Sequence, residues 1–155
     1  MFRAEQLHLL ICRYLEKIHG SDNENIDQAI ISLTNLLELP QSEANIEMIL
    51  LKEFKTIFPH RAAYVGDKAM DDFIQTARDR SAEYSLPPVA GAALLVILMS
   101  MFGYGCTQDK LYPWISKILL DEKVQDPLAR LERLQRKALI WLKELLKAGQ
   151  LEQLT

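Results

Sequence analysis

The longest stretch of this chain without a charged side chain lies between Glu83 and Asp109. Its middle, Val89 to Phe102, is almost wholly apolar, so it is either a membrane span or the central helix of a compact core. The Pro-Pro pair at 87–88 favours a helix start, because a residue in the first turn needs no partner for its N–H. The glycines at 103 and 105 favour a helix end, because glycine readily adopts the left-handed conformation.

The length of this segment favours the core helix. Its fourteen residues rise about 21 Å at about 1.5 Å per residue, whereas the hydrocarbon core of a bilayer is ~30 Å thick. A helix that is apolar on every side is one surrounded by other helices. We therefore expect no membrane partner, and we expect the small residues at 90–93 to let neighbouring helices approach closely.

Apolar residues recur at helical spacing along the rest of the chain. Residues 60–66 are interpreted as a connection, and Pro113 makes regular helix in the sixth segment begin near Tyr112. The sequence predicts an all-α fold, a single compact bundle of about seven helices around the central apolar helix Val89 to Phe102. The predicted helices cover residues 2–19, 21–39, 42–58, 67–80, 89–102, 109–120 and 126 onward.

At 155 residues the chain is long enough to bury a sizeable core. We expect residues 1–155 to form a single helical domain with a C-terminal tail, 149–155, that can fray. The last helix carries apolar residues at the 3-4 spacing of a helix-packing seam. This face is wider than one domain can cover, so we expect that the protein can form a homodimer or other homo-oligomer through the final helix. The seam consists of Leu131, Leu134, Ala138, Trp141 and Leu145.

Composition indicates a soluble cytoplasmic protein that does not bind nucleic acid. The formal net charge is −3, the wrong sign for a phosphate backbone. The basic residues of the last helix lie opposite its leucine rows and are interpreted as a solvated face. The amphipathic pattern that follows Met1 differs from a signal peptide. Cys12 and Cys106 are expected to be free thiols, although one disulfide is the alternative.

The chain contains no recognisable catalytic or metal-binding pattern. His8 and His19 are about 16 Å apart along one predicted helix and cannot share an ion. Asp71 and Asp72 are adjacent helical residues that point about 100° apart, so cooperative acid–base chemistry is not expected. We expect no catalytic residues, no metal and no cofactor.

The segment that most resembles a binding site follows the apolar helix. Aromatic side chains bury large areas at low entropic cost and therefore anchor interfaces. Alternatively, Trp114 and Leu111 join the core and the tyrosines cover its edge. The thiol of Cys106 would be reactive if a helix N-terminus lowered its pKa. The candidate partner-binding residues are Tyr104, Cys106, Asp109, Tyr112 and Trp114.

These observations favour a non-enzymatic protein–protein interaction module, such as a regulator, adaptor, chaperone or inhibitor of a protein partner. One alternative is a helical bundle that encloses a small apolar ligand beside the helix 89–102. The other alternative is an enzyme of unrecognised type, which would need a cleft that gathers His60, Cys106 or the region of Asp71.

Overall fold

The computed structural model describes the backbone of residues 22–154 and the side chains of residues 25–148. The predicted helix at 2–19, with His8, Cys12 and His19, lies outside these residues. The described part contains seven α-helices and no strand, which confirms the all-α prediction. The α-helices are α2 (Asp22–Thr34), α3 (Ile46–Ile57), α4 (Pro59–Tyr64), α5 (Asp67–Glu83), α6 (Pro88–Phe102), α7 (Pro113–Leu119) and α8 (Pro127–Leu154).

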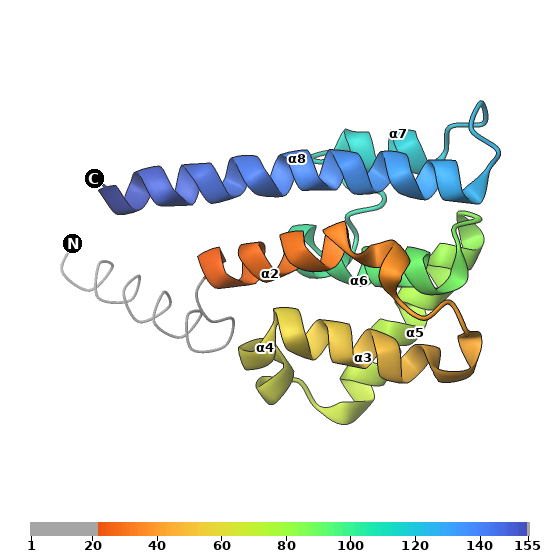
Figure 1. The fold of residues 1–155 in the computed structure, drawn as a ribbon, viewed down its shortest axis with the longest axis horizontal. Helices are drawn as coiled ribbons and strands as arrows, with labels where there is room; N and C mark the ends of the chain where they lie inside the picture. Colours follow the sequence, from red (N-terminus) through yellow and green to blue (C-terminus); the bar gives the residue numbers. More distant parts are fainter. Residues whose placement is uncertain (1–21, 155) are drawn as a thin grey trace.

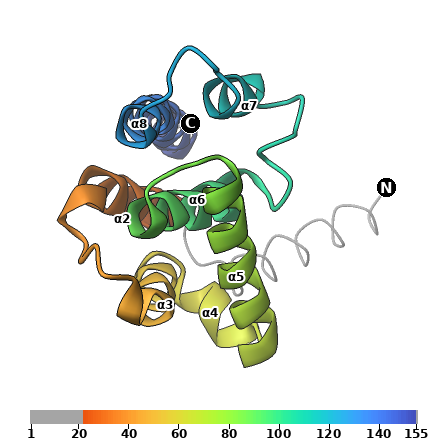
Figure 2. The ribbon, with the colours of Figure 1, turned by 90° about the vertical axis from the view of Figure 1, so that its right-hand side faces the viewer.

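The apolar helix α6 lies at the centre of the bundle, as predicted. Every residue from Val89 to Ser100 is buried. Figure 2 shows α6 and α2 in a middle layer, with α7 and α8 on one side and α3 and α4 on the other; α5 runs steeply from the second outer layer to α6. Among the described helices, none combines the length and the apolarity that crossing a bilayer requires.

Local sequence signals set the ends of α6. Pro88 occupies the first turn, and Gly103 follows the helix with φ at +109°, a conformation that favours glycine. Within α6, Gly91 lies so close to α5 and the α5–α6 turn that a Cβ atom there would clash with the hydroxyl of Ser81 and with Cβ of Leu86. The predicted close approach at the small residues is therefore confirmed at Gly91.

Three helix predictions were wrong. The third predicted helix, 42–58, opens with a 3₁₀ turn, η2 (Glu43–Asn45), and its α-helix begins only at Ile46. Residues 60–66 were interpreted as a connection, but Pro59–Tyr64 forms α4. Phe58 leaves helical geometry with φ −125° and ψ 61°, and Pro59 then starts a new helix as a favourable first-turn residue. The second predicted helix is also shorter than expected: α2 ends at Thr34 and a 3₁₀ turn, η1 (Leu36–Glu38), follows it.

The C-terminal helix α8 begins at Pro127, as predicted, and runs to Leu154 (Figure 1). Fraying of residues 149–155 stays a prediction. The inner face of α8 is buried against the bundle at Leu131, Leu134, Ala138 and Leu142. The Gln135 side chain also donates a hydrogen bond to the carbonyl oxygen of Leu33 at the end of α2. The opposite face of α8 is exposed, and α7 lies along one side of α8 in the same layer (Figure 2).

Candidate functional site

The aromatic segment of residues 104–114 forms a turn-rich connection between α6 and α7. Tyr104 is 55% exposed, yet its side chain lies against α5. Its hydroxyl is 3.0 Å from Oγ1 of Thr76, and the guanidinium carbon of Arg80 lies 4.7 Å from the centre of its ring. Arg80 also donates a hydrogen bond to the carbonyl oxygen of Tyr104. These contacts fix the start of the connection to α5.

The next two candidate residues, Cys106 and Asp109, are part of the internal structure of the connection. Cys106 is only 1% exposed, and burial raises the pKa of its thiol to about 11, although the cation of Arg80 opposes this shift. This shift is opposite to the lowering on which the reactivity of the thiol would depend. Asp109 accepts a hydrogen bond of 2.9 Å from the backbone N–H of Leu111, so its carboxylate stabilises the turn.

Tyr112 and Trp114 belong to a cluster of four aromatic rings. The rings of Trp114 and Trp141 are stacked, with centroids 5.8 Å apart and planes 21° apart. Phe102 packs edge-on against both tryptophans and lies 4.8 Å from the ring of Tyr112. The cluster joins the end of α6 to α7 and α8. Within it, Trp114 is 92% buried, with 8% of its surface exposed.

The structure thus separates the predicted site residues. Tyr104 contacts α5, whereas Tyr112 and Trp114 contact α8 through Trp141. Leu111, which was considered as a core residue, is 75% exposed. Of the five candidates, Trp114 lies beside a surface groove.

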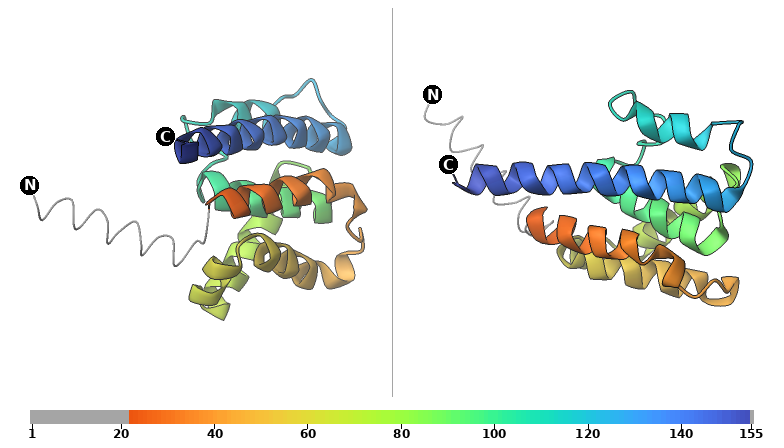
Figure 3. Two further views of the ribbon diagram at one scale, coloured as in Figure 1. Left: turned by 60° about the vertical axis from the view of Figure 1, so that its left-hand side comes forward. Right: turned by 45° about the horizontal axis from the view of Figure 1, so that its top comes forward.

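This groove lies between α7 and α8, which run side by side as the outer layer of the bundle (Figures 2 and 3). Its volume is about 350 Å³. One wall comes from α7 and the residues after it, and the other comes from α8. We call it the α7–α8 groove; its lining residues are Trp114, Lys117, Ile118, Asp121, Arg133, Arg136, Lys137 and Ile140.

Both walls of the α7–α8 groove have the same helical spacing. The four lining residues of each wall fall at i, i+3, i+4 and i+7, which is one face of a helix. Apolar contributions come from Trp114, Ile118 and Ile140, and Ile140 is 52% exposed. Charged side chains supply the rest of the lining, so the groove combines apolar and charged surface.

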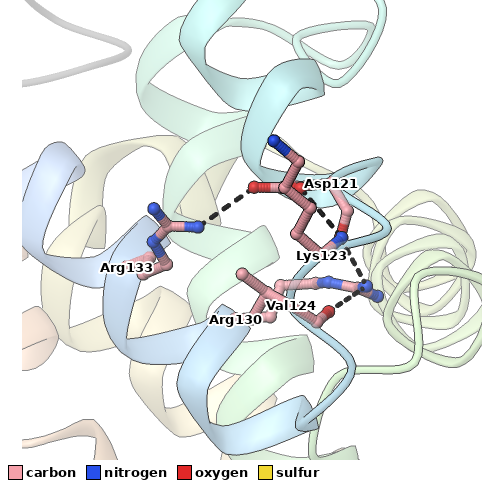
Figure 4. A network of polar contacts seen from close by, with 5 residues as sticks. All are labelled: Asp121, Lys123, Val124, Arg130 and Arg133. Atoms are coloured by element: carbon pink, nitrogen blue, oxygen red, sulfur yellow. Dashed lines mark hydrogen bonds and ion pairs between the residues drawn. The ribbon is translucent and has the colours of Figure 1, made fainter.

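The charges of the groove are predominantly positive. Four cationic side chains and one carboxylate line it, whereas the whole chain has a net charge of −3. The single carboxylate, Asp121, lies 3.1 Å from Arg133 across the groove (Figure 4). It also accepts a hydrogen bond of 3.0 Å from the backbone N–H of Lys123. This hydrogen bond, followed by the contact with Arg133, lowers the pKa of Asp121.

Three cations of the groove have no ionic partner within the described part of the chain. Lys117, Arg136 and Lys137 are exposed and form no ion pair with any residue that the structure describes. Sequence reasoning assigned the cations of the last helix to a solvated face. Lys117 gave no signal in the sequence. Only the packing of α7 beside α8 places its charge next to the cations of α8.

Other kinds of site find no support in the described residues. No group of three or more His, Cys, Asp or Glu side chains among them is arranged to hold a metal ion. Four surface pockets of the described part, the α7–α8 groove included, have no lining residue from 89–102. In comparisons with known proteins, no family model, no curated protein and no solved structure matches this chain.

Proposed function

We propose that the protein is a non-enzymatic interaction module that binds a protein partner in the α7–α8 groove. The observation that carries this proposal is the combination, on one outer face of the bundle, of an apolar strip with cations that form no ion pair among the described residues. Such a module would act as a regulator, adaptor, chaperone or inhibitor. Its effect would come from occupying a surface of the partner.

The composition of the groove is that of a binding hot spot. Tryptophan and arginine are enriched among the residues that dominate binding energy, and hot spots lie in apolar pockets surrounded by a rim that excludes water. The small exposed part of Trp114 belongs to a ring held by stacking on Trp141, and Ile140 provides the larger exposed apolar area. A rigid anchor loses little conformational entropy on binding.

The wall residues are held by the fold, which favours a preformed site. The Asp121–Arg133 ion pair joins the loop after α7 to α8. The guanidinium of Arg130, one turn earlier on α8, donates hydrogen bonds to the carbonyl oxygens of Val124 (2.7 Å) and Asp121 (3.3 Å) in the same loop. A partner would therefore meet two walls whose spacing is already set.

Site-specific photo-cross-linking in the native cell tests this proposal. A benzophenone amino acid placed at Ile140 should form a discrete cross-link to a partner protein. The same probe at Met48, which is 71% exposed on α3, is the matched control and should not form that cross-link. The double variant Arg136→Glu/Lys137→Glu should abolish the product from Ile140.

Two results would contradict the proposal. One is an equal yield of the same product from Met48 and Ile140, which would indicate collision and not a binding site. The other is a product at Ile140 that persists when both cations are reversed and Trp114 is replaced by alanine in a folded variant.

A further inference from the structure

We infer that the α7–α8 groove recognises an acidic amphipathic helix of the partner. In this arrangement, carboxylates of the partner face Lys117, Arg136 and Lys137, while its apolar side chains cover Ile118, Ile140 and the edge of Trp114. This inference rests on the proposed function and adds the chemistry of the bound segment.

Charge complementarity is the first argument. Asp121, the only carboxylate among the described lining residues, is already bound to Arg133 and to the backbone of Lys123. The three remaining cations have no ion pair among the described residues, so the groove carries uncompensated positive charge. Acidic groups on a partner would pair with it, whereas a basic segment would be repelled.

The spacing of the walls is the second argument. The lining residues of both walls recur at intervals of three and four residues: Lys117 lies between Trp114 and Ile118 on one wall, and three cations precede Ile140 on the other. A partner helix with acidic and apolar residues at the same intervals presents matching rows, which is the helix-in-groove mode of recognition. A groove of about 350 Å³ accommodates the anchoring side chains of such a helix, while the helix itself lies along the rim.

The indole N–H of Trp114 is the third argument. Trp114 lines the groove, and its Nε1 is buried with no hydrogen-bond partner among the described residues. Buried donors are usually paired, although Oγ of Ser100 and Nε of Arg130 also lack a partner among the described residues, so the indole N–H can still take an acceptor. A carboxylate or carbonyl oxygen of the bound segment would supply it. Since less than 1 Å² of this atom is exposed, the side chains that cover it must move aside as the partner binds.

Three designed helical peptides test the inference on the full-length protein. All three peptides carry leucine along one row of the helix. The neighbouring row consists of Glu in the first peptide, Gln in the second and Lys in the third. Fluorescence anisotropy should show binding of the Glu peptide, at least about tenfold weaker binding of the Gln peptide, and no binding of the Lys peptide. Raising the salt concentration should weaken the Glu complex, because exposed ion pairs are screened.

Variants of the protein identify the surface that binds. Arg136→Glu/Lys137→Glu should lose the Glu peptide and gain the Lys peptide, a reversal that misfolding cannot produce. Lys52→Glu/Lys55→Glu, two exposed lysines of α3, is the matched control and should bind like the wild type. Trp114→Phe, which keeps a ring but removes the N–H, should bind the Glu peptide about fivefold to tenfold more weakly.

The outcomes separate the inference from the proposed function. The inference of an acidic helix is overturned if the Glu and Gln peptides bind equally, or if the charge-reversed groove binds as the wild type does. Cross-links from Ile140 would then still support a protein partner at this groove. A dimer seen by light scattering that the charge reversal dissociates, with no peptide binding, would overturn it in favour of a second copy of the chain. Full binding by a folded Trp114→Phe variant overturns the role of the N–H.

Discussion

The guanidinium of Arg130 donates a hydrogen bond of 2.6 Å to the carbonyl oxygen of Tyr84. Tyr84 is the C-cap residue of α5, where carbonyl groups lack partners within the helix. The same guanidinium bonds to Val124 and Asp121 in the loop before α8 (Figure 4). One side chain near the start of α8 therefore joins the end of α5 to the loop that forms one end of the groove.

Replacing Arg130 with methionine should destabilise the protein by about 2–4 kcal/mol, because hydrogen bonds from a charged group contribute about 1.5–3 kcal/mol each and are not additive. Arg133→Met is the matched control on the same helix. Its ion pair with Asp121 is exposed and should contribute less than about 1 kcal/mol. Urea unfolding measures both, and equal losses would contradict the structural role of Arg130.

Gly91→Ala should destabilise the protein by about 1–3 kcal/mol, the usual cost of overpacking a core. Helix propensity alone predicts the opposite sign, since alanine is favoured over glycine by about 1 kcal/mol within a helix. Steric conflict with Ser81 and Leu86 outweighs that gain. Gly66→Ala is the steric control, because no atom lies within 4 Å of a Cβ there; it should change the stability by less than about 1 kcal/mol, since alanine's smaller unfolded-state entropy offsets its weaker preference for the N-cap of α5. A more stable Gly91→Ala variant would show that α6 is not packed this closely.

Leu111 and Ile115 provide a test of which side of the α6–α7 connection faces the core. Ile115→Ala should cost about 2–5 kcal/mol, because Ile115 is fully buried and its truncation leaves a cavity. Leu111→Ala should change the stability by less than about 0.5 kcal/mol, because Leu111 is 75% exposed. Thermal or urea unfolding of the two variants gives the comparison, and similar losses would place Leu111 in the core after all.

The thiol of Cys106 should be unreactive in the folded protein. With its pKa raised to about 11, about one thiol in a thousand is ionised at pH 8, and only the thiolate attacks an alkylating agent. Iodoacetamide labelling, read by mass spectrometry of the peptide that contains Cys106, should be at least about 100-fold slower in the native state than in denaturant. Comparable rates would show that the thiol is not held in a desolvated site.

The same pKa shift predicts a pH dependence of stability. Between pH 9.0 and about 11, the unfolded thiol loses its proton while the folded thiol keeps it. The free energy of unfolding should therefore fall as the pH rises through this range. Cys106→Ala should reduce this fall relative to the wild type, and an identical pH profile for the two proteins would contradict the assignment.

The helix boundaries that could be predicted from sequence are those set by neighbouring residues. The start of α6 at Pro88 and its end before Gly103 follow from backbone geometry that proline and glycine impose locally. The start of α8 at Pro127 follows in the same way. Pro59 was ambiguous by the same rule, because a proline that ends α3 is also a favourable first residue for α4.

The candidate site could be predicted only in part. Trp114 was identified because an aromatic residue beside glycines and prolines indicates a recognition surface. Lys117 and Ile118 gave no such signal, since isolated basic and aliphatic residues at helical spacing are usual on any amphipathic helix. The burial of Cys106 and the exposure of Leu111 depend on how the connection folds over α5 and α8, which periodicity within the connection does not reveal.

Sequence alone determined that Val89 to Phe102 is a core helix, because a charge-free segment of that length with proline before it and glycine after it has no other favourable environment in water. Tertiary structure decided what lies on the outer face of the bundle. The α7–α8 groove combines residues 114–121 with residues 133–140, and each set alone is an ordinary helix face. Their shared charge and apolar strip exist only because two helices that are separated by a loop pack side by side.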